Sequence, residues 1–122
     1  MQIAEALVAR DAENAVWQED LAAGQTELAR VLVDRGDPAA ARPQLEAALA
    51  RYRILARTDN AYDVNVAKVG TLLARILAQE GDAAAARVLL EEAIGLVREG
   101  AAGDPERASV LAEAQVARAA LE

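Results

Sequence analysis

The feature that most constrains the fold is an internal repeat, in which two long stretches of the chain match without a gap. Residues 28–53, LARVLVDRGDPAAARPQLEAALARYR, align on residues 73–98, LARILAQEGDAAAARVLLEEAIGLVR, at an offset of 45 residues. The two stretches are identical at 14 of 26 positions. Self-similarity at a fixed period of this size is typical of folds that stack one supersecondary unit on the next. We therefore expect a single domain, residues 1–122, built from repeated units.

Both copies carry the same Gly-Asp pair, which predicts a turn between two helices. Gly36 and Gly81 suit the end of a helix, because glycine takes the left-handed conformation without a steric penalty. Asp37 and Asp82 can each start the next helix by accepting a hydrogen bond from a free backbone N–H. Pro38 fits the first position of that helix, where its missing N–H costs nothing. Each copy is thus predicted to be a helical hairpin.

A second series of helix starts recurs at the same spacing of 45 residues. Asn14, Asp59 and Asp104 are all good N-cap residues, and Pro105 follows the last of them. All three prolines are expected at helix boundaries. The pattern predicts helices over residues 15–35, 38–57, 60–80, 83–99 and 105–121, with residues 2–10 as the end of an earlier helix.

These starts also divide the domain into units. Residues 1–13 are interpreted as the end of a preceding repeat, residues 14–58 as the first repeat and residues 59–103 as the second. Residues 104–122 would be either a capping helix or the first half of a third repeat. A chain that starts inside a repeat indicates a fragment of a larger protein, since the cut unit would expose an apolar face.

The apolar residues favour helices and argue against strands. Hydrophobic residues make up 54% of the chain and aromatic residues only 2%, so alanine and leucine, which are strong helix formers, dominate the core candidates. No Asn-Gly or Asp-Gly hairpin signal separates alternating runs. We predict an all-α fold, an α-solenoid of antiparallel helical hairpins. Another α-solenoid or a plain antiparallel helical bundle is the alternative architecture.

The repeated positions resemble the tetratricopeptide repeat family. The family pattern places large apolar and small residues around a Gly-Asp turn, and here it is carried by Leu28, Ala29, Leu32, Gly36, Asp37, Ala41, Leu45 and Ala48, and again by Leu73, Ala74, Leu77, Gly81, Asp82, Ala86, Leu90 and Ala93. The period of 45 exceeds the usual 34, so the resemblance is to long-helix, bacterial members of the family. It implies a TPR-like superhelix that binds other proteins.

Composition excludes several classes of function. Without histidine or cysteine, the chain cannot form the usual nucleophile–base pairs or zinc sites. The adjacent carboxylates lie at predicted helix ends or on polar faces, so we expect no enzyme, no metal and no cofactor. A net charge of −7 disfavours nucleic-acid binding, and no apolar run approaches the ~20 residues that span a membrane. We expect a cytoplasmic protein.

The resemblance implies a candidate binding surface, because the first helix of each family hairpin lines the concave side. By repeat position this places Thr26, Arg30 and Val33 beside Lys68, Thr71 and Arg75. Three cations in one groove could hold an acidic or C-terminal segment of a protein or peptide. Alternatively, this is an ordinary solvated face on which Arg30 pairs with Asp34 one turn on.

Two further hypotheses concern function and packing. The leading function is a protein-interaction or scaffold module of a larger signalling or regulatory protein, and the alternative is self-association into homo-oligomers through open repeat ends. Trp17 and Tyr62 stand 45 residues apart. Their matched spacing favours filling the gap between consecutive hairpins over an exposed contact with a partner.

Overall fold

The chain folds into α-helices joined by short turns, as the repeat predicts. The computed structural model describes the backbone of residues 2–122 and the side chains of residues 14–122. Over residues 2–122 the α-helices are α1 (Gln2–Asp34), α2 (Pro38–Ala56), α3 (Asp63–Gln79), α4 (Ala83–Val97) and α5 (Pro105–Ala119), with short 3-10 helices at Asn60–Tyr62 and Ala101–Gly103. This part of the chain contains no strand, so the all-α prediction is confirmed.

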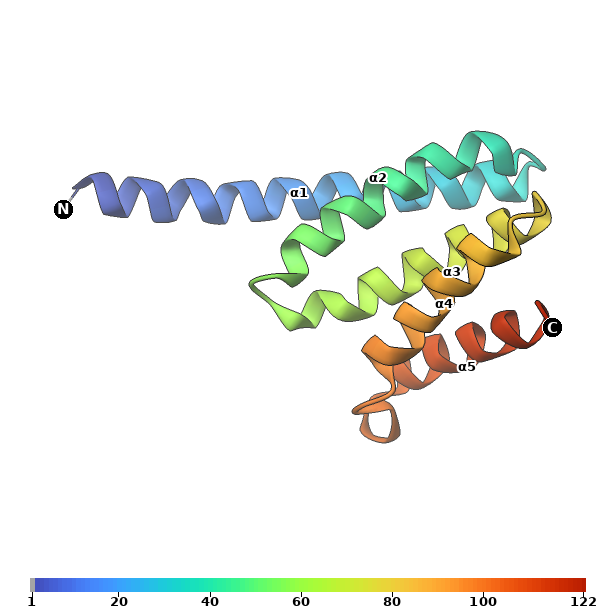
Figure 1. Ribbon diagram of the computed structural model, residues 1–122. Coiled ribbons are helices and arrows are strands. Elements are labelled where there is room, and N and C mark those ends of the chain that lie inside the picture. The colour runs from blue at the N-terminus through green and yellow to red at the C-terminus, as the bar shows by residue number, and fades with distance from the viewer. Residues whose placement is uncertain (1) are drawn as a thin grey trace.

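Two antiparallel hairpins and a fifth helix lie side by side. Helices α1 and α2 form the first hairpin and α3 and α4 form the second, with α2 packed on α3 (Figure 1). Helix α5 packs against both α3 and α4. The first half of α1 extends beyond α2 (Figure 1). The arrangement is the TPR-like helical stack that the sequence predicted.

Both hairpins turn through the same Gly-Asp geometry. Gly36 has φ 83° and Gly81 has φ 90°, so both glycines are left-handed. In the first turn the N–H of Asp37 donates to the carbonyl of Leu32 at 2.8 Å and the N–H of Gly36 donates to Val33 at 2.9 Å, which is a Schellman motif. The second turn repeats both bonds. The predicted positive φ at Gly36 and Gly81 is confirmed.

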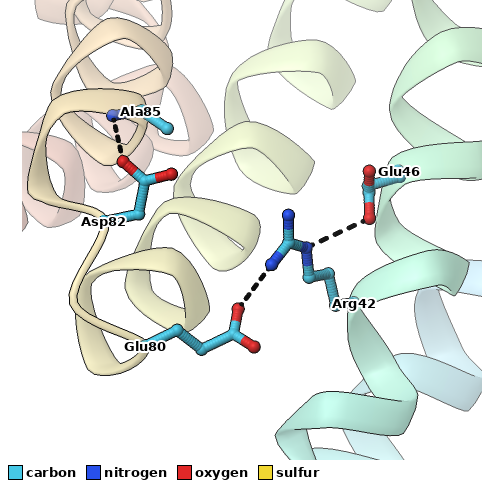
Figure 2. Close-up of polar contacts among 5 residues, drawn as sticks. All are labelled: Arg42, Glu46, Glu80, Asp82 and Ala85. Carbon is cyan, nitrogen blue, oxygen red and sulfur yellow. Dashed lines mark hydrogen bonds and ion pairs between the residues drawn. The ribbon is translucent and has the colours of Figure 1, made fainter.

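The aspartates that follow these glycines cap the next helices. A side-chain oxygen of Asp37 accepts from the backbone N–H of Ala40 at 3.2 Å, and Asp82 accepts from Ala85 at 3.1 Å (Figure 2). Asp104 likewise caps α5. Asp59 caps the 3-10 turn at Asn60–Tyr62, so α3 starts at Asp63, three residues later than predicted. Each cap satisfies backbone donors that the helix leaves unpaired.

Two further predictions about the helices are wrong. Helix α1 runs from Gln2 to Asp34 without a break at Asn14, so there is no separate helix over residues 2–10. Asn14 is flanked by the helix formers Ala12, Glu13 and Ala15, with no glycine or proline to stop the helix, whereas Gly100 and Gly103 precede Asp104. Assignment of residues 1–13 to a preceding repeat stays a prediction.

The second wrong prediction is that all three prolines lie at helix boundaries. Pro43 lies inside α2 rather than at its end. Proline has no N–H to bond the carbonyl of Ala39, but both residues are exposed, so water can solvate that carbonyl.

The hairpins pack through alanines at the helix crossings. Six alanines that the repeat pattern picks out are at most 1% exposed, and these are Ala29, Ala41, Ala48, Ala74, Ala86 and Ala93. Small side chains let neighbouring helices approach closely, and Leu45, Leu90 and Ile94 are among the largest fully buried side chains of the core. Side-chain size at these positions therefore sets the distance between helices.

Side-chain contacts join the two hairpins at both ends of the interface. Near one end the rings of Tyr52 and Tyr62 lie 6.3 Å apart. At the other, Arg42 of α2 donates to Glu80 at the end of α3 at 2.9 Å and to Glu46 of its own helix at 3.2 Å (Figure 2). The hydrogen bond to Glu80 raises the pKa of Arg42 above its ordinary value. Exposed ion pairs of this kind add little stability.

Replacing either turn glycine with alanine should destabilise the protein. Gly36→Ala and Gly81→Ala should each lower the free energy of unfolding by about 1 kcal/mol, because a side chain is strained at these φ values. Gly95→Ala, in the interior of α4 with open space around it, is the matched control and should raise stability by about 0.5–1 kcal/mol. Urea titration measures all three. A stable Gly36→Ala would contradict the assigned turn.

Enlarging an alanine at a helix crossing should also destabilise. Ala48→Leu and Ala93→Leu insert three carbons where no space exists, so each should lower the free energy of unfolding by about 1–3 kcal/mol. The control is Ala50→Leu, an exposed position on the same helix as Ala48. If denaturation midpoints of all three variants equal that of wild type, these alanines do not limit the approach of the helices.

Candidate functional site

A groove runs along the side of the protein formed by α1, α3 and α5. It consists of depressions of about 330 Å³ between α1 and α3, about 390 Å³ reaching α5, and about 310 Å³ between α3 and α5. A smaller one of about 190 Å³ lies between α1, α2 and α3. Arg30 lines three of the four and Arg75 lines three, so neighbouring depressions share walls. We call this surface the α1–α3–α5 groove.

The structure brings the three predicted cations together in this groove. Arg30 and Arg75 both line the 330 Å³ and 390 Å³ depressions, and Lys68 lines the 390 Å³ one with them. Each projects from the first helix of its hairpin, because Arg30 and Arg75 hold the same repeat position. The positive charges thus lie at the centre of the groove.

Carboxylates lie among the cations. Lys68 contacts Glu106 of α5 at 3.5 Å, and Arg30 contacts Glu27 of its own helix at 3.9 Å. The predicted pairing of Arg30 with Asp34 is not found: the arginine turns back toward Glu27. Arg75 forms no ion pair with any residue whose side chain the structure describes. Exposed ion pairs of this kind add little stability.

The three uncharged candidates divide between groove and core. Val33 is exposed and lines the 330 Å³ depression. Thr26 is 8% exposed, touches only the smallest depression, and its hydroxyl donates to the carbonyl of Ala22 at 2.8 Å. Thr71 is 2% exposed, bonds Ala67 in the same way, and lines none of the four depressions. Thr71 is therefore part of the buried interior and does not form the groove surface on which the sequence placed it.

The sequence reasoning missed the apolar floor of the groove. Leu72 and Ile76 of α3 line the 330 Å³ depression with Val33. Both lie within one turn of Arg75, so helical spacing from the cations would have found them. The groove therefore offers donors and positive charge above an aliphatic surface.

The described residues show no site for a metal. No group of three or more acidic side chains among residues 14–122 could hold a metal ion. In the part of the chain that the structure covers, no helix is both long and apolar enough to cross a membrane.

Comparison with known protein families agrees with this geometry. The family described as tetratricopeptide repeat matches residues 21–59. The chain contains a tetratricopeptide repeat. The match spans the half of α1 that packs on α2, then α2 itself, and ends at the cap before α3. Searches of curated proteins and of solved structures gave no match.

Tetratricopeptide repeats generally mediate protein–protein interactions, and the family is typically non-catalytic. The second hairpin lies outside the matched residues, but it repeats the first one at 14 of 26 aligned positions. The groove described above is formed by the first helices of both hairpins together with α5.

The two aromatic residues that stand 45 residues apart behave differently. Tyr62 is half-buried, packs on Tyr52, and donates its hydroxyl to Glu19 at 2.7 Å. It fills the gap between hairpins, as predicted. Trp17 is 60% exposed, so the same interpretation is wrong for Trp17. Within residues 2–122 no hairpin precedes α1 to cover it.

The Tyr62 contact should be visible in a pH titration. The hydrogen bond to Glu19 raises the pKa of Tyr62 to about 12, with burial as the second cause. Because the protonated phenol is favoured in the folded state, its contribution is complete below an unfolded pKa of about 10 and is lost as pH rises toward 12. Tyrosinate absorbance should show that Glu19→Gln lowers this pKa. An unchanged titration would mean that the bond does not form in solution.

Proposed function

We propose that this chain is a protein-interaction or scaffold module that holds a partner segment in the α1–α3–α5 groove. The observation that carries the proposal is that Arg30 and Arg75, which hold the same repeat position in two hairpins, line the same two depressions. Such a repeated cation presents donors at regular intervals along the groove. A partner in extended or helical form can follow it.

The chemistry of the groove indicates the partner. Arg30 and Arg75 supply several N–H donors and no acceptors, so they favour a carboxylate from Asp, Glu or a chain terminus. Val33 and Leu72 offer an aliphatic contact beside them. The proposed partner is a protein segment in which an acidic residue lies next to an aliphatic one, within a signalling or scaffolding assembly. Glu106 and Glu113 at the α5 end of the groove would repel a uniformly acidic segment.

Self-association is the second candidate. Apolar side chains are exposed at the two ends of the helical stack, with Trp17 on α1 and Val116 on α5. End-to-end stacking would bury them. Light scattering over a range of protein concentrations tests this, since a constant monomer mass at high concentration would exclude it.

Charge reversal in the groove should remove binding without unfolding the protein. The probe is an array of short peptides that pair Asp or Glu with Leu or Ile, each with a twin carrying Asn or Gln instead. Wild type should prefer the acidic members, and Arg30→Glu with Arg75→Glu should weaken their binding by about tenfold or more. Added salt should weaken it too, because charges in an open groove are screened over about 8 Å.

The matched control is Arg57→Glu with Arg98→Glu, which makes the same change in net charge at two exposed arginines that line none of the groove depressions. Circular dichroism checks that both double variants stay helical. Equal affinity of wild type and the groove variant for the acidic peptides would move the binding site off this groove.

A further inference from the structure

An apolar stripe of α1 faces away from the rest of the protein. Its members recur at spacings of four and three residues, which places them on one side of the helix, and they are Trp17, Leu21, Gly24, Leu28 and Val31. Trp17 is 60% exposed and Leu28 is 47% exposed. We call this stripe the open face of α1. It lies apart from the α1–α3–α5 groove, since none of these five residues lines a groove depression.

The same stripe exists on α3, where it is covered. Moving each position by 45 residues gives Tyr62, Val66, Val69, Leu73 and Ile76, of which the last four are buried and Tyr62 is half-buried. Helix α2 covers this stripe: Tyr52 contacts Tyr62 at one end, and Arg42 bonds Glu80 at the other. The stripe on a first helix is therefore built to receive the second helix of a preceding hairpin.

The junction between α4 and α5 follows the same rule. At one end, Arg107 of α5 donates to the carbonyl of Leu96 at 3.1 Å. At the other, Arg87 of α4 contacts Glu122, just after α5, at 4.0 Å. Arg87 is the counterpart of Arg42. In both covered junctions an arginine early in the covering helix thus meets a glutamate at the end of the helix it covers.

The open face of α1 carries the opposite charge at this end. The position of Glu80 is taken by Arg35, which is exposed and forms no ion pair with the side chains that the structure describes. A covering helix with an arginine in the place of Arg42 would bring two like charges together, which is unfavourable. A second copy of this chain cannot supply a favourable covering helix from α2 or α4, because these helices carry Arg42 and Arg87 and are already packed on α3 and α5. Its α5 has Glu106 in the first turn, but that carboxylate already pairs with Lys68 at 3.5 Å.

From these contacts we infer that the open face of α1 is a second binding surface, which takes an amphipathic helix of a partner protein running antiparallel to α1. The bound helix lays an aliphatic stripe over Leu21, Gly24 and Leu28. It carries Asp or Glu in its first two turns, opposite Arg35, where the positive end of its own dipole also favours an acidic side chain. Gly24 leaves room for a large side chain at the centre of the contact.

A pair of peptides tests this charge rule. The first has the 19-residue sequence of α2, and the second differs by Arg42→Glu. Both carry the same side-chain crosslink to hold them helical, because isolated helices of this length are marginal in water. Trp17 is the only tryptophan of the chain and α2 has none, so its fluorescence reports binding at the open face directly.

The Arg42→Glu peptide should shift Trp17 emission to shorter wavelength and bind the wild-type protein about fivefold more tightly than the unchanged peptide. In an Arg35→Glu protein the order of the two peptides should invert. Arg57→Glu, an exposed arginine away from this face, is the control and should keep the wild-type order. Leu28→Glu should abolish the shift with either peptide while helicity is retained.

Three results would overturn the inference. The first is the absence of any change in Trp17 emission with either peptide up to about 1 mM. The second is equal affinity of the two peptides for the wild-type protein, and the third is an unchanged order of the two peptides with the Arg35→Glu protein. None of these results tests the proposed groove function. That function is tested separately, by binding of the acidic peptides to the Arg30→Glu, Arg75→Glu variant, in which the open face of α1 is unchanged.

Discussion

The reversal of the chain at Gly36 and Gly81 is the constraint on which the rest of the structure depends. In each turn a left-handed glycine ends one helix through paired backbone bonds, and the next residue, an aspartate, starts the following helix. Because the two turns share one geometry, α1 and α2 are arranged in the first hairpin as α3 and α4 are arranged in the second. The positions 45 residues apart then become equivalent in space, so Arg30 and Arg75 face the same groove.

Alanine at the helix crossings allows the helices to pack closely. Positions such as Ala48 and Ala93 are fully buried, so little side-chain volume separates the helix backbones where the helices cross. The larger aliphatic residues are left to pack between hairpins and to form the floor of the groove. On α3 the large residues Val66, Leu73 and Ile76 are buried. Their counterparts on α1 include Leu28 and Val31, which are exposed because no helix among the described residues covers them.

Charge then distinguishes surfaces that share the same backbone. The groove holds three cations, but Glu27 and Glu106 already engage two of them. The end of α1 carries Arg35 where the equivalent end of α3 carries Glu80. The net charge of −7 belongs to the whole chain, so it does not reveal the positive side chains in the groove or at the end of α1. Selectivity on such a scaffold comes from single side chains at equivalent repeat positions, and the fold can stay constant while they change.

The sequence by itself determined the helices, the two turns, the four aspartate caps and the equivalence of Arg30 with Arg75. These features depend on local backbone preference and on a repeated register, which neighbouring residues reveal. Only the tertiary structure decided that α1 continues through Asn14, that Thr71 is buried and that Trp17 is exposed. A cap residue permits a helix to start but does not force one, and the exposure of a side chain depends on whether another helix covers it. Such contacts join residues far apart in the chain, so a local pattern does not contain them.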